Sequence, residues 1–286
     1  MAKRRKKRSK RSHNSVGTLL MIIGAIAVII ALVGVGVFLY LNTETEVALN
    51  KEDLCPEQGA RGTVAFLLDT TDELAPVTKA EIKEKILVTQ QSIPRFSRLS
   101  VYTLSESGLT IQPVASICNP GRLDQMDKLA QDGLTANPVM IERKYGEFRD
   151  KIFSSVNNVF EQEFEGSQSP LLSSLQELSV VIPSPVDIES ETYPAGRNKI
   201  VFVTDFLEHT EIFSIYRNGL DFEVFRNSRA KEKFGKSYRN LDIEVLLVRR
   251  NIKNFSTMDL AQFWARVFKQ EFNSDFISMK LLSGEI

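Results

Sequence analysis

Residues 64–73 read Val64-Ala65-Phe66-Leu67-Leu68-Asp69-Thr70-Thr71-Asp72-Glu73, an apolar run that ends in an acidic, hydroxyl-rich turn. Five apolar residues in succession are typical of a strand buried on both faces of a sheet. Ligands of open α/β sheets bind beyond the carboxyl ends of the strands, so this turn is a candidate site. Two later segments could complete it, Gly166-Ser167-Gln168-Ser169-Pro170-Leu171 and Ile200-Val201-Phe202-Val203-Thr204-Asp205.

Further apolar runs predict the rest of the sheet. Strands are expected at 64–68, 99–104, 109–114, 200–204, 243–248 and about 276–281. Helical patterns lie between most of these runs, and this alternation predicts an α/β fold with a doubly wound, mostly parallel sheet. The runs at 99–104 and 109–114 are joined by a hairpin-length segment, which predicts one antiparallel edge strand.

Three helix starts are predicted from capping residues. Thr78 with Glu81 and Ser256 with Asp259 each have the spacing of a capping box. Ser169 precedes a proline and a leucine-rich pattern, so it is expected at the N-cap with proline at the first helical position. Apolar residues at four-residue spacing over 148–160 predict another helix.

The N-terminus predicts a membrane anchor. Residues 1–15 form a tail with eight basic residues, and 16–41 are an uninterrupted apolar stretch. About 20 apolar residues suffice to cross a bilayer, and signal peptides have shorter apolar regions of about 7 to 15 residues. We therefore expect an uncleaved signal anchor, a cytoplasmic tail that contacts anionic lipid, and a C-terminal part in the periplasm or outside the cell. A nucleic-acid-binding tail is the alternative for the basic run.

The remainder is acidic and large enough for one core. Without the eight tail charges, 28 basic residues face 36 acidic ones, so no polyanion such as a nucleic acid is expected as a partner. Residues 42–61 are polar and predict a stalk, and 62–286 predict a single domain.

Cys55 and Cys118 are the two cysteines, and both lie in the part predicted to be exported. A disulfide between them would stabilise the domain by about 3 to 4 kcal/mol by the loop-entropy argument. Two unpaired, buried thiols are the alternative, because sequence gives no separation between Cα atoms.

Oxygen-bearing side chains follow the strands expected to lie side by side. Asp69 and Asp205 end two strands, and Thr71 and Ser169 add hydroxyls. Such hard oxygen ligands are those that Mg²⁺ and Mn²⁺ prefer. The alternative is that these residues are ordinary turn and capping residues without a ligand.

At these residues the chain resembles a von Willebrand factor type A domain, the fold also seen in integrin I domains. Asp69 and Thr71 match the first two members of the family's Asp-x-Ser-x-Ser motif, Ser169 with Pro170-Leu171 matches its threonine loop, and Asp205 matches its last aspartate. The resemblance covers roughly 62–286 and implies a metal-ion-dependent adhesion site, in which hydroxyls coordinate the ion and a partner's acidic residue completes it.

Glu73 departs from the family pattern, because it stands where the motif has its second serine. Its carboxylate could fill the ion's open position from within and give a structural or self-inhibited site. It could equally point away and leave no ion. The predicted metal ligands are therefore Asp69, Thr71, Glu73, Ser169 and Asp205.

Conventional catalysis is not expected. His209 is the one histidine outside the basic tail and lies in a polar stretch typical of a surface. The sequence has no nucleophile elbow, P-loop or dinucleotide-binding glycine pattern, so we expect neither an enzyme nor a small-molecule substrate.

The segment 205–241 is long for a simple crossover and is rich in aromatic and basic residues. It predicts either an amphipathic helix with a solvated basic side or a docking surface for an acidic partner or lipid headgroups.

The sequence as a whole predicts a single-pass, membrane-anchored domain that mediates protein–protein interaction or assembly at the cell envelope and that a divalent ion could gate. Two alternatives stay open. One is a metal-dependent, phosphatase-like hydrolase that uses Asp69 and Asp205, and the other is a structural subunit of a secretion, transfer or defence complex with a degenerate metal site.

Overall fold

A computed structural model describes residues 14–42, 47–104, 113–126, 128–131, 133, 136–162, 166–188, 193–235, 238, 241–274 and 276–285. Two compact units divide the chain. The first comprises 1–46 and 127–138, and the second comprises 47–126 and 139–286.

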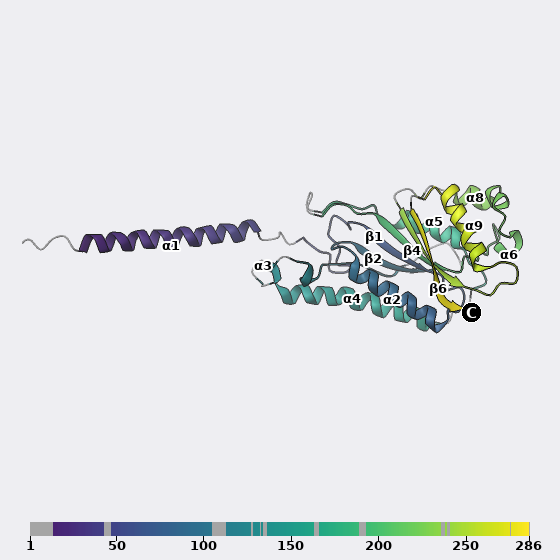
Figure 1. Cartoon of the computed structure of the whole chain (residues 1–286), viewed down its shortest axis with the longest axis horizontal. Coiled ribbons are helices and arrows are strands. Elements are labelled where there is room, and N and C mark those ends of the chain that lie inside the picture. The colour runs from purple at the N-terminus through teal and green to yellow at the C-terminus, as the bar shows by residue number, and fades with distance from the viewer. Residues whose placement is uncertain are drawn as a thin grey trace, which may run out of the picture. The chain divides into compact units, whose positions relative to one another are not determined.

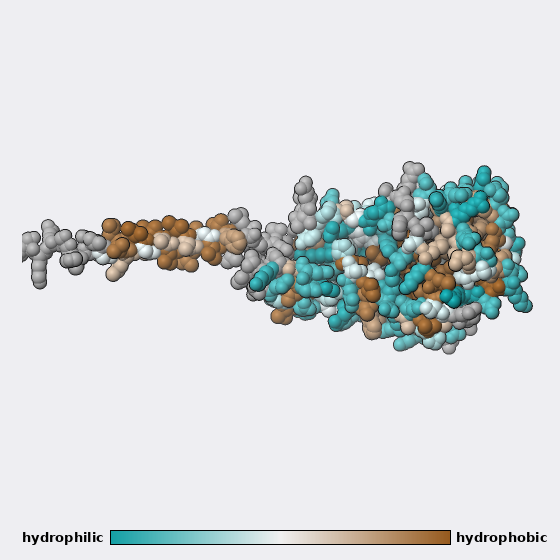
Figure 2. Space-filling view, viewed as in Figure 1, coloured by the Kyte–Doolittle hydropathy of each residue, from teal (hydrophilic) through white to brown (hydrophobic). Residues whose placement is uncertain are grey.

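Helix α1, Asn14–Asn42, is the apolar helix of the first unit. Its large apolar side chains from Leu19 to Phe38 are exposed, and Figure 2 shows this helix as mostly brown with paler patches. The 20-residue stretch Leu19–Phe38 is long and apolar enough to cross a membrane. A helix of this kind near an N-terminus is compatible with a membrane anchor or with a signal sequence.

The second unit is built on a six-stranded sheet in the order β3-β2-β1-β4-β5-β6, of which Figure 1 labels β1, β2, β4 and β6. The strands are β1 (Thr63–Leu68), β2 (Arg98–Thr103), β3 (Pro113–Cys118), β4 (Asn198–Thr204), β5 (Leu241–Arg249) and β6 (Phe276–Glu285). Every neighbouring pair is parallel except β2 and β3. The predicted fold class, a mostly parallel sheet with one antiparallel edge, is confirmed.

Helices cover both faces of this sheet. They are α2 (Pro76–Ser92), α4 (Pro138–Glu161), α5 (Leu171–Val181), α6 (Ile215–Asn218), α7 (Phe222–Arg226), α8 (Arg229–Phe234) and α9 (Thr257–Gln270), and the short elements η1 (Leu123–Gln125) and α3 (Lys128–Gln131) lie between β3 and α4 in the chain. Alternate residues of β1 show the two layers, since Leu67 packs in the core with α5 and α9 whereas Phe66 packs in the core with α2 and α4. This period of two gives each strand two buried faces.

Three local predictions need correction. The edge strand was predicted at 109–114 but lies at Pro113–Cys118, where Ala115 and Ile117 are buried; 105–112 lie outside the described residues. Helix α2 starts at Pro76 without a side-chain cap, because proline already fits the first helical turn, so the Thr78–Glu81 capping box was wrong.

Ser169 was the third wrong prediction, because α5 begins after Pro170 and the serine side chain makes no capping hydrogen bond. The capping box of Ser256 and Asp259 at α9 is confirmed. The helix predicted over 148–160 is confirmed as part of α4, whose core-facing side chains include Phe148 and Ile152.

The long segment after β4 folds into the short helices α6, α7 and α8 instead of one amphipathic helix. Its aromatic side chains Phe213, Phe222 and Phe225 are buried in the core on the α5 and α9 face, whereas Tyr216 is exposed. Core packing therefore accounts for most of its aromatic residues. The basic residues at 236 and 239 lie outside the described residues.

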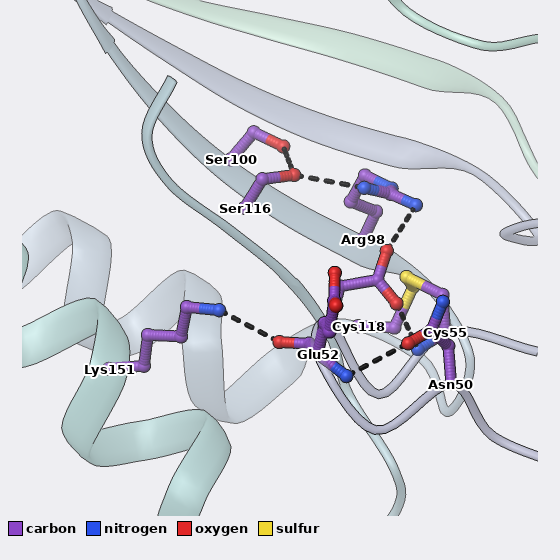
Figure 3. Close-up of a disulfide and its surroundings, with 9 residues drawn as sticks. Asn50, Glu52, Cys55, Arg98, Ser100, Ser116, Cys118 and Lys151 are labelled. Atoms are coloured by element: carbon purple, nitrogen blue, oxygen red, sulfur yellow. Dashed lines mark hydrogen bonds and ion pairs between the residues drawn. A yellow bond between two sulfur atoms is a disulfide. The ribbon is translucent and has the colours of Figure 1, made fainter.

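A disulfide joins Cys55 and Cys118 on the side of the sheet where the parallel strands begin, which we call the amino edge (Figure 3). It joins the segment that precedes β1 to the last residue of the edge strand β3, and both cysteines are buried. Beside it, the Arg98 guanidinium donates hydrogen bonds to Asp53 Oδ2 (3.0 Å) and to Ser116 Oγ (3.0 Å). The Cys118 N–H also donates a hydrogen bond to the Asp53 carbonyl (2.8 Å), so the segment entering the domain is fixed to the sheet by a covalent bond, an ion pair and a backbone hydrogen bond.

Candidate functional site

Asp69 and Asp205 lie at the carboxyl ends of the neighbouring central strands β1 and β4. The register pairs Leu68 with Val203, and the Asp69 N–H donates a hydrogen bond to the Val203 carbonyl (2.8 Å). Both aspartates are buried, with exposed fractions of 7% and 6%. The strand order therefore brings two carboxylates from distant parts of the sequence to one edge of the sheet.

Hydroxyl groups of the chain engage both carboxylate oxygens of Asp69. Thr71 Oγ1 donates to Oδ1 (2.7 Å), and Thr204 Oγ1 donates to Oδ2 (3.0 Å). Burial, followed by the negative charge of Asp205, raises the pKa of Asp69 above its usual range, and these hydrogen bonds only partly oppose the rise. Asp69 is thus a satisfied, desolvated group.

Arg250 neutralises Asp205. Its Nε donates to Asp205 Oδ2 at 2.9 Å, and its Nη2 lies 3.7 Å from Asp72 Oδ2. The Leu207 N–H donates to the other Asp205 oxygen (3.0 Å). Burial raises the pKa of Asp205, and the Leu207 and Arg250 contacts act against that rise.

The third segment, 166–169, is held against the other two by its backbone. The Gly166 N–H donates to the Thr71 carbonyl (3.2 Å), and a Cβ at Gly166 would lie 3.0 Å from the Thr71 Cβ, so glycine permits this close approach. Ser169 and His209 exchange two backbone hydrogen bonds (3.0 and 3.1 Å). The Ser169 hydroxyl is buried and has no hydrogen-bond partner among the residues that the structure describes.

These segments surround a pocket of about 130 Å³, lined by 71–72, 166–169, Asp205, Leu207, His209 and Tyr216. His209 is half-buried and its Nδ1 lies 2.9 Å from Ser214 Oγ. The Tyr216 ring packs edge-on against the imidazole at 5.4 Å and is 56% exposed. The pocket therefore combines a buried hydroxyl, the carboxylates of Asp72 and Asp205, and an exposed aromatic ring.

Phe206, directly after Asp205, has a left-handed backbone conformation with φ of 64°. A bulky residue rarely adopts this conformation, and strain of this kind concentrates at functional sites. Trp264 supports it, because the indole stacks on the Phe206 ring (5.4 Å) and its Nε1–H donates to the Phe206 carbonyl (2.9 Å). Trp264 of α9 thus holds the backbone next to Asp205 in place.

Glu208 is a buried carboxyl group that the sequence did not single out. Its Oε2 accepts the Leu172 N–H (2.9 Å) at the start of α5, and its Oε1 accepts the Thr210 hydroxyl (3.0 Å). Burial raises the pKa of Glu208 to about 8. Glu208 therefore caps the helix at the position where Ser169 was predicted to do so.

The structure brings together four of the five predicted metal ligands, Asp69, Thr71, Ser169 and Asp205. Glu73 is exposed and does not line the pocket, so it does not fill a metal position from within.

The residues as arranged do not fit Mg²⁺ or Mn²⁺. The Thr71 hydroxyl is hydrogen-bonded to Asp69, Arg250 holds Asp205, and of the four groups Ser169 Oγ alone is unengaged. Among the described residues, no three His, Cys, Asp or Glu side chains form a group that could hold an ion. Metal binding stays a prediction.

Sequence reasoning missed Arg250, Thr204 and Glu208. A signal for Arg250 was present, because it closely follows the run predicted as the strand at 243–248 and therefore had to lie at the same edge as Asp69. Thr204 lies one residue before Asp205 in a segment already singled out. Glu208 had no signal, since the helix it caps is 36 residues away in the sequence.

Comparisons with known proteins give structural likeness only. No family model matches the chain, and none of the curated proteins is detectably similar to it in sequence. Among solved structures, a von Willebrand factor type A protein from Catenulispora acidiphila is similar over 79% of this chain and 39% of its own, at 11% identity and a TM-score of 0.42. The PilB minor pilin from Streptococcus sanguinis is similar over 78% of this chain and 58% of its own, at 10% identity and a TM-score of 0.37.

Both likenesses are distant, and the chain spans less than two thirds of the length of either protein. The class of this protein is therefore assigned from its own structure. It is an α/β domain with a doubly wound, mostly parallel sheet and a pocket at the carboxyl ends of the strands.

Proposed function

We propose that this protein is an interaction module, anchored in a membrane by α1, which docks one side chain of a protein partner in the pocket at the carboxyl edge of its sheet. The observation that carries the proposal is the pocket itself. At about 130 Å³ it is smaller than the roughly 300 to 1,000 Å³ of small-molecule sites, so it suits a side chain better than a whole metabolite. Its exposed Tyr216 is of a residue type enriched at protein interfaces.

Two features support an extracytoplasmic position for the domain. The eight basic residues before α1 favour a cytoplasmic N-terminus by the positive-inside rule. The buried disulfide Cys55–Cys118 favours an oxidising compartment for everything after α1. We propose on this basis that the domain faces the periplasm or the cell exterior. Protease protection in closed vesicles tests on which side of the membrane the domain lies.

Affinity capture from detergent-solubilised membranes tests the docking proposal. Gln168 is an exposed residue that lines the pocket, and Gln168→Phe fills it without touching the core. We expect this variant to lose the partner that the wild type captures. The matched control is Gln91→Phe, at an exposed position of α2, which should retain it.

Three results would count against the proposal. Equal capture by both variants would show that the pocket is not the docking site. Phosphatase activity that requires Mg²⁺ and disappears in Asp69→Ala would favour the hydrolase alternative. Capture that survives substitution of both Asp69 and Asp205 would favour a structural subunit with a degenerate site. A chelator should leave capture unchanged, because the residues as arranged do not fit Mg²⁺ or Mn²⁺.

A further inference from the structure

At the carboxyl edge of the sheet, the Arg250 cation lies largely buried between two carboxylates. Arg250 follows β5, and its side chain is only 14% exposed. The guanidinium lies between Asp205, at 2.9 Å from Nε, and Asp72, at 3.7 Å from Nη2. The two carboxylates come from the ends of different strands, so a single arginine ties together the loops that follow β1, β4 and β5.

We propose that the Arg250 guanidinium is the resident cation of this edge and takes the place that the sequence leads one to expect for Mg²⁺ or Mn²⁺. The loops that follow β1, β4 and β5 then keep their positions without a divalent ion. This inference concerns ion binding alone and goes beyond the proposed docking function, because it holds whether or not the pocket binds a partner.

Charge and geometry both support the substitution. A guanidinium is always protonated and carries several N–H donors in a fixed plane, so it can engage two carboxylates at once. An added divalent ion would be repelled by this positive charge in surroundings from which water is largely excluded. It would also have to compete for Asp205, whose two oxygens already accept from Arg250 and from the Leu207 N–H.

The remaining oxygen groups explain what removal of the arginine would uncover. Arg250→Ala leaves the carboxylates of Asp205 and Asp72 without their counter-charge, close to the Thr71 hydroxyl and to the buried, unpartnered Ser169 hydroxyl. Oxygen ligands of this type suit Mg²⁺ and Mn²⁺. We therefore expect loss of the arginine to increase divalent-ion affinity by about tenfold or more, as removal of a neighbouring positive charge dictates.

The test uses the full-length chain in detergent. Mn²⁺ and Mg²⁺ binding is measured by calorimetry, and the unfolding midpoint is followed by fluorescence of Trp264, the only tryptophan, which stacks behind Asp205 on Phe206. We expect the wild type to bind no stoichiometric Mn²⁺ and to unfold at the same temperature with chelator or with Mn²⁺. Arg250→Ala should unfold at a lower temperature in chelator and recover with Mn²⁺.

Two variants separate charge from general damage. Arg250→Lys keeps the positive charge and should remain indifferent to Mn²⁺. Arg197→Ala removes an arginine that pairs with Asp242 (2.9 Å) at the amino ends of β4 and β5, and it should show no response to the ion. If Arg250→Ala does not fold in chelator, folding with Mn²⁺ supports the proposal, and Arg250→Gln provides the second neutral variant.

Stoichiometric Mn²⁺ binding by the wild type, with a higher unfolding midpoint, would overturn the proposal whatever the variants do. Failure of both Arg250→Ala and Arg250→Gln to gain ion binding would overturn it as well. Neither outcome bears on partner capture, so this inference and the docking proposal fail separately.

Discussion

The amino edge and the carboxyl edge of the same sheet are held together by opposite means. At the amino edge, Cys55–Cys118 joins the entering segment to β3 covalently, and the nearby ion pair of Arg98 and Asp53 is about a quarter exposed (21% and 26%). At the carboxyl edge no covalent bond links the loops, and the pair of Arg250 and Asp205 is largely buried (14% and 6%).

The difference separates stability from recognition. A disulfide stabilises a protein mainly by restricting the conformations of the unfolded chain, so its effect depends little on the residues that surround it in the native structure. Buried charges are costly to desolvate and hold only while every partner stays in place. We infer that this cost at the carboxyl edge goes with the docking role proposed for its pocket, whereas the amino edge fixes the segment through which the chain enters the domain.

The largest effect should come from removing the disulfide. Cys55→Ser with Cys118→Ser opens a link between residues 63 positions apart, which corresponds to a loss of about 4 kcal/mol in the free energy of unfolding. Denaturant unfolding of the full-length chain in detergent, followed by Trp264 fluorescence, measures it. A reductant should lower the stability of the wild type to that of the variant and leave the variant unchanged. A loss below about 1 kcal/mol would show that the amino edge does not depend on its covalent bond.

The second effect is a dependence on pH at the carboxyl edge. Burial raises the folded-state pKa of Glu208 to about 8, well above that of a free glutamate, so the native state keeps a proton that the unfolded chain releases at lower pH. The stabilising contribution is complete below about pH 4.5 and is lost as the pH rises towards 8. Between pH 6 and 8 the free energy of unfolding should fall by about 2 kcal/mol from this group.

Glu208→Gln isolates that contribution, because the amide can still accept the Leu172 N–H and donate to the Thr210 hydroxyl. We expect the variant to be more stable than the wild type at pH 8 and similar to it near pH 5. The matched control is Glu84→Gln at an exposed position of α2, which should keep the wild-type slope. A wild-type slope in Glu208→Gln would show that Glu208 is charged in the native state.

The two edges also differ in how far the sequence predicted them. The strand ends at Asp69 and Asp205 were found because unbroken apolar runs mark buried parallel strands and their carboxyl ends share one edge. The hydrogen bonds from Thr204 to Asp69 and from Arg250 to Asp205 were not predicted, because the periodicity of apolar residues gives the end of a strand but not the direction of a side chain. For Ser169, a local capping rule competed with a carboxylate from a distant loop, and the buried Glu208 replaced it as the cap.

At the amino edge, the smallest effect should come from Asp53→Asn, which removes the charge that faces Arg98. Exposed or half-exposed pairs contribute about 0 to 1 kcal/mol, and the disulfide already fixes the segment to which Asp53 belongs. We therefore expect a loss of less than about 1 kcal/mol in the free energy of unfolding, reduced further by salt.

The same substitution in the Cys55→Ser, Cys118→Ser background sharpens the comparison. With the covalent bond removed, the Arg98 hydrogen bonds to Asp53 and Ser116 remain between the entering segment and β3, together with the backbone hydrogen bond from the Cys118 N–H to the Asp53 carbonyl (2.8 Å). Asp53→Asn should then cost more than it does in the wild type, which a double-mutant cycle measures as a coupling energy. Equal costs in the two backgrounds would mean that the bond and the ion pair act independently, and that the amino edge is not a single clamp.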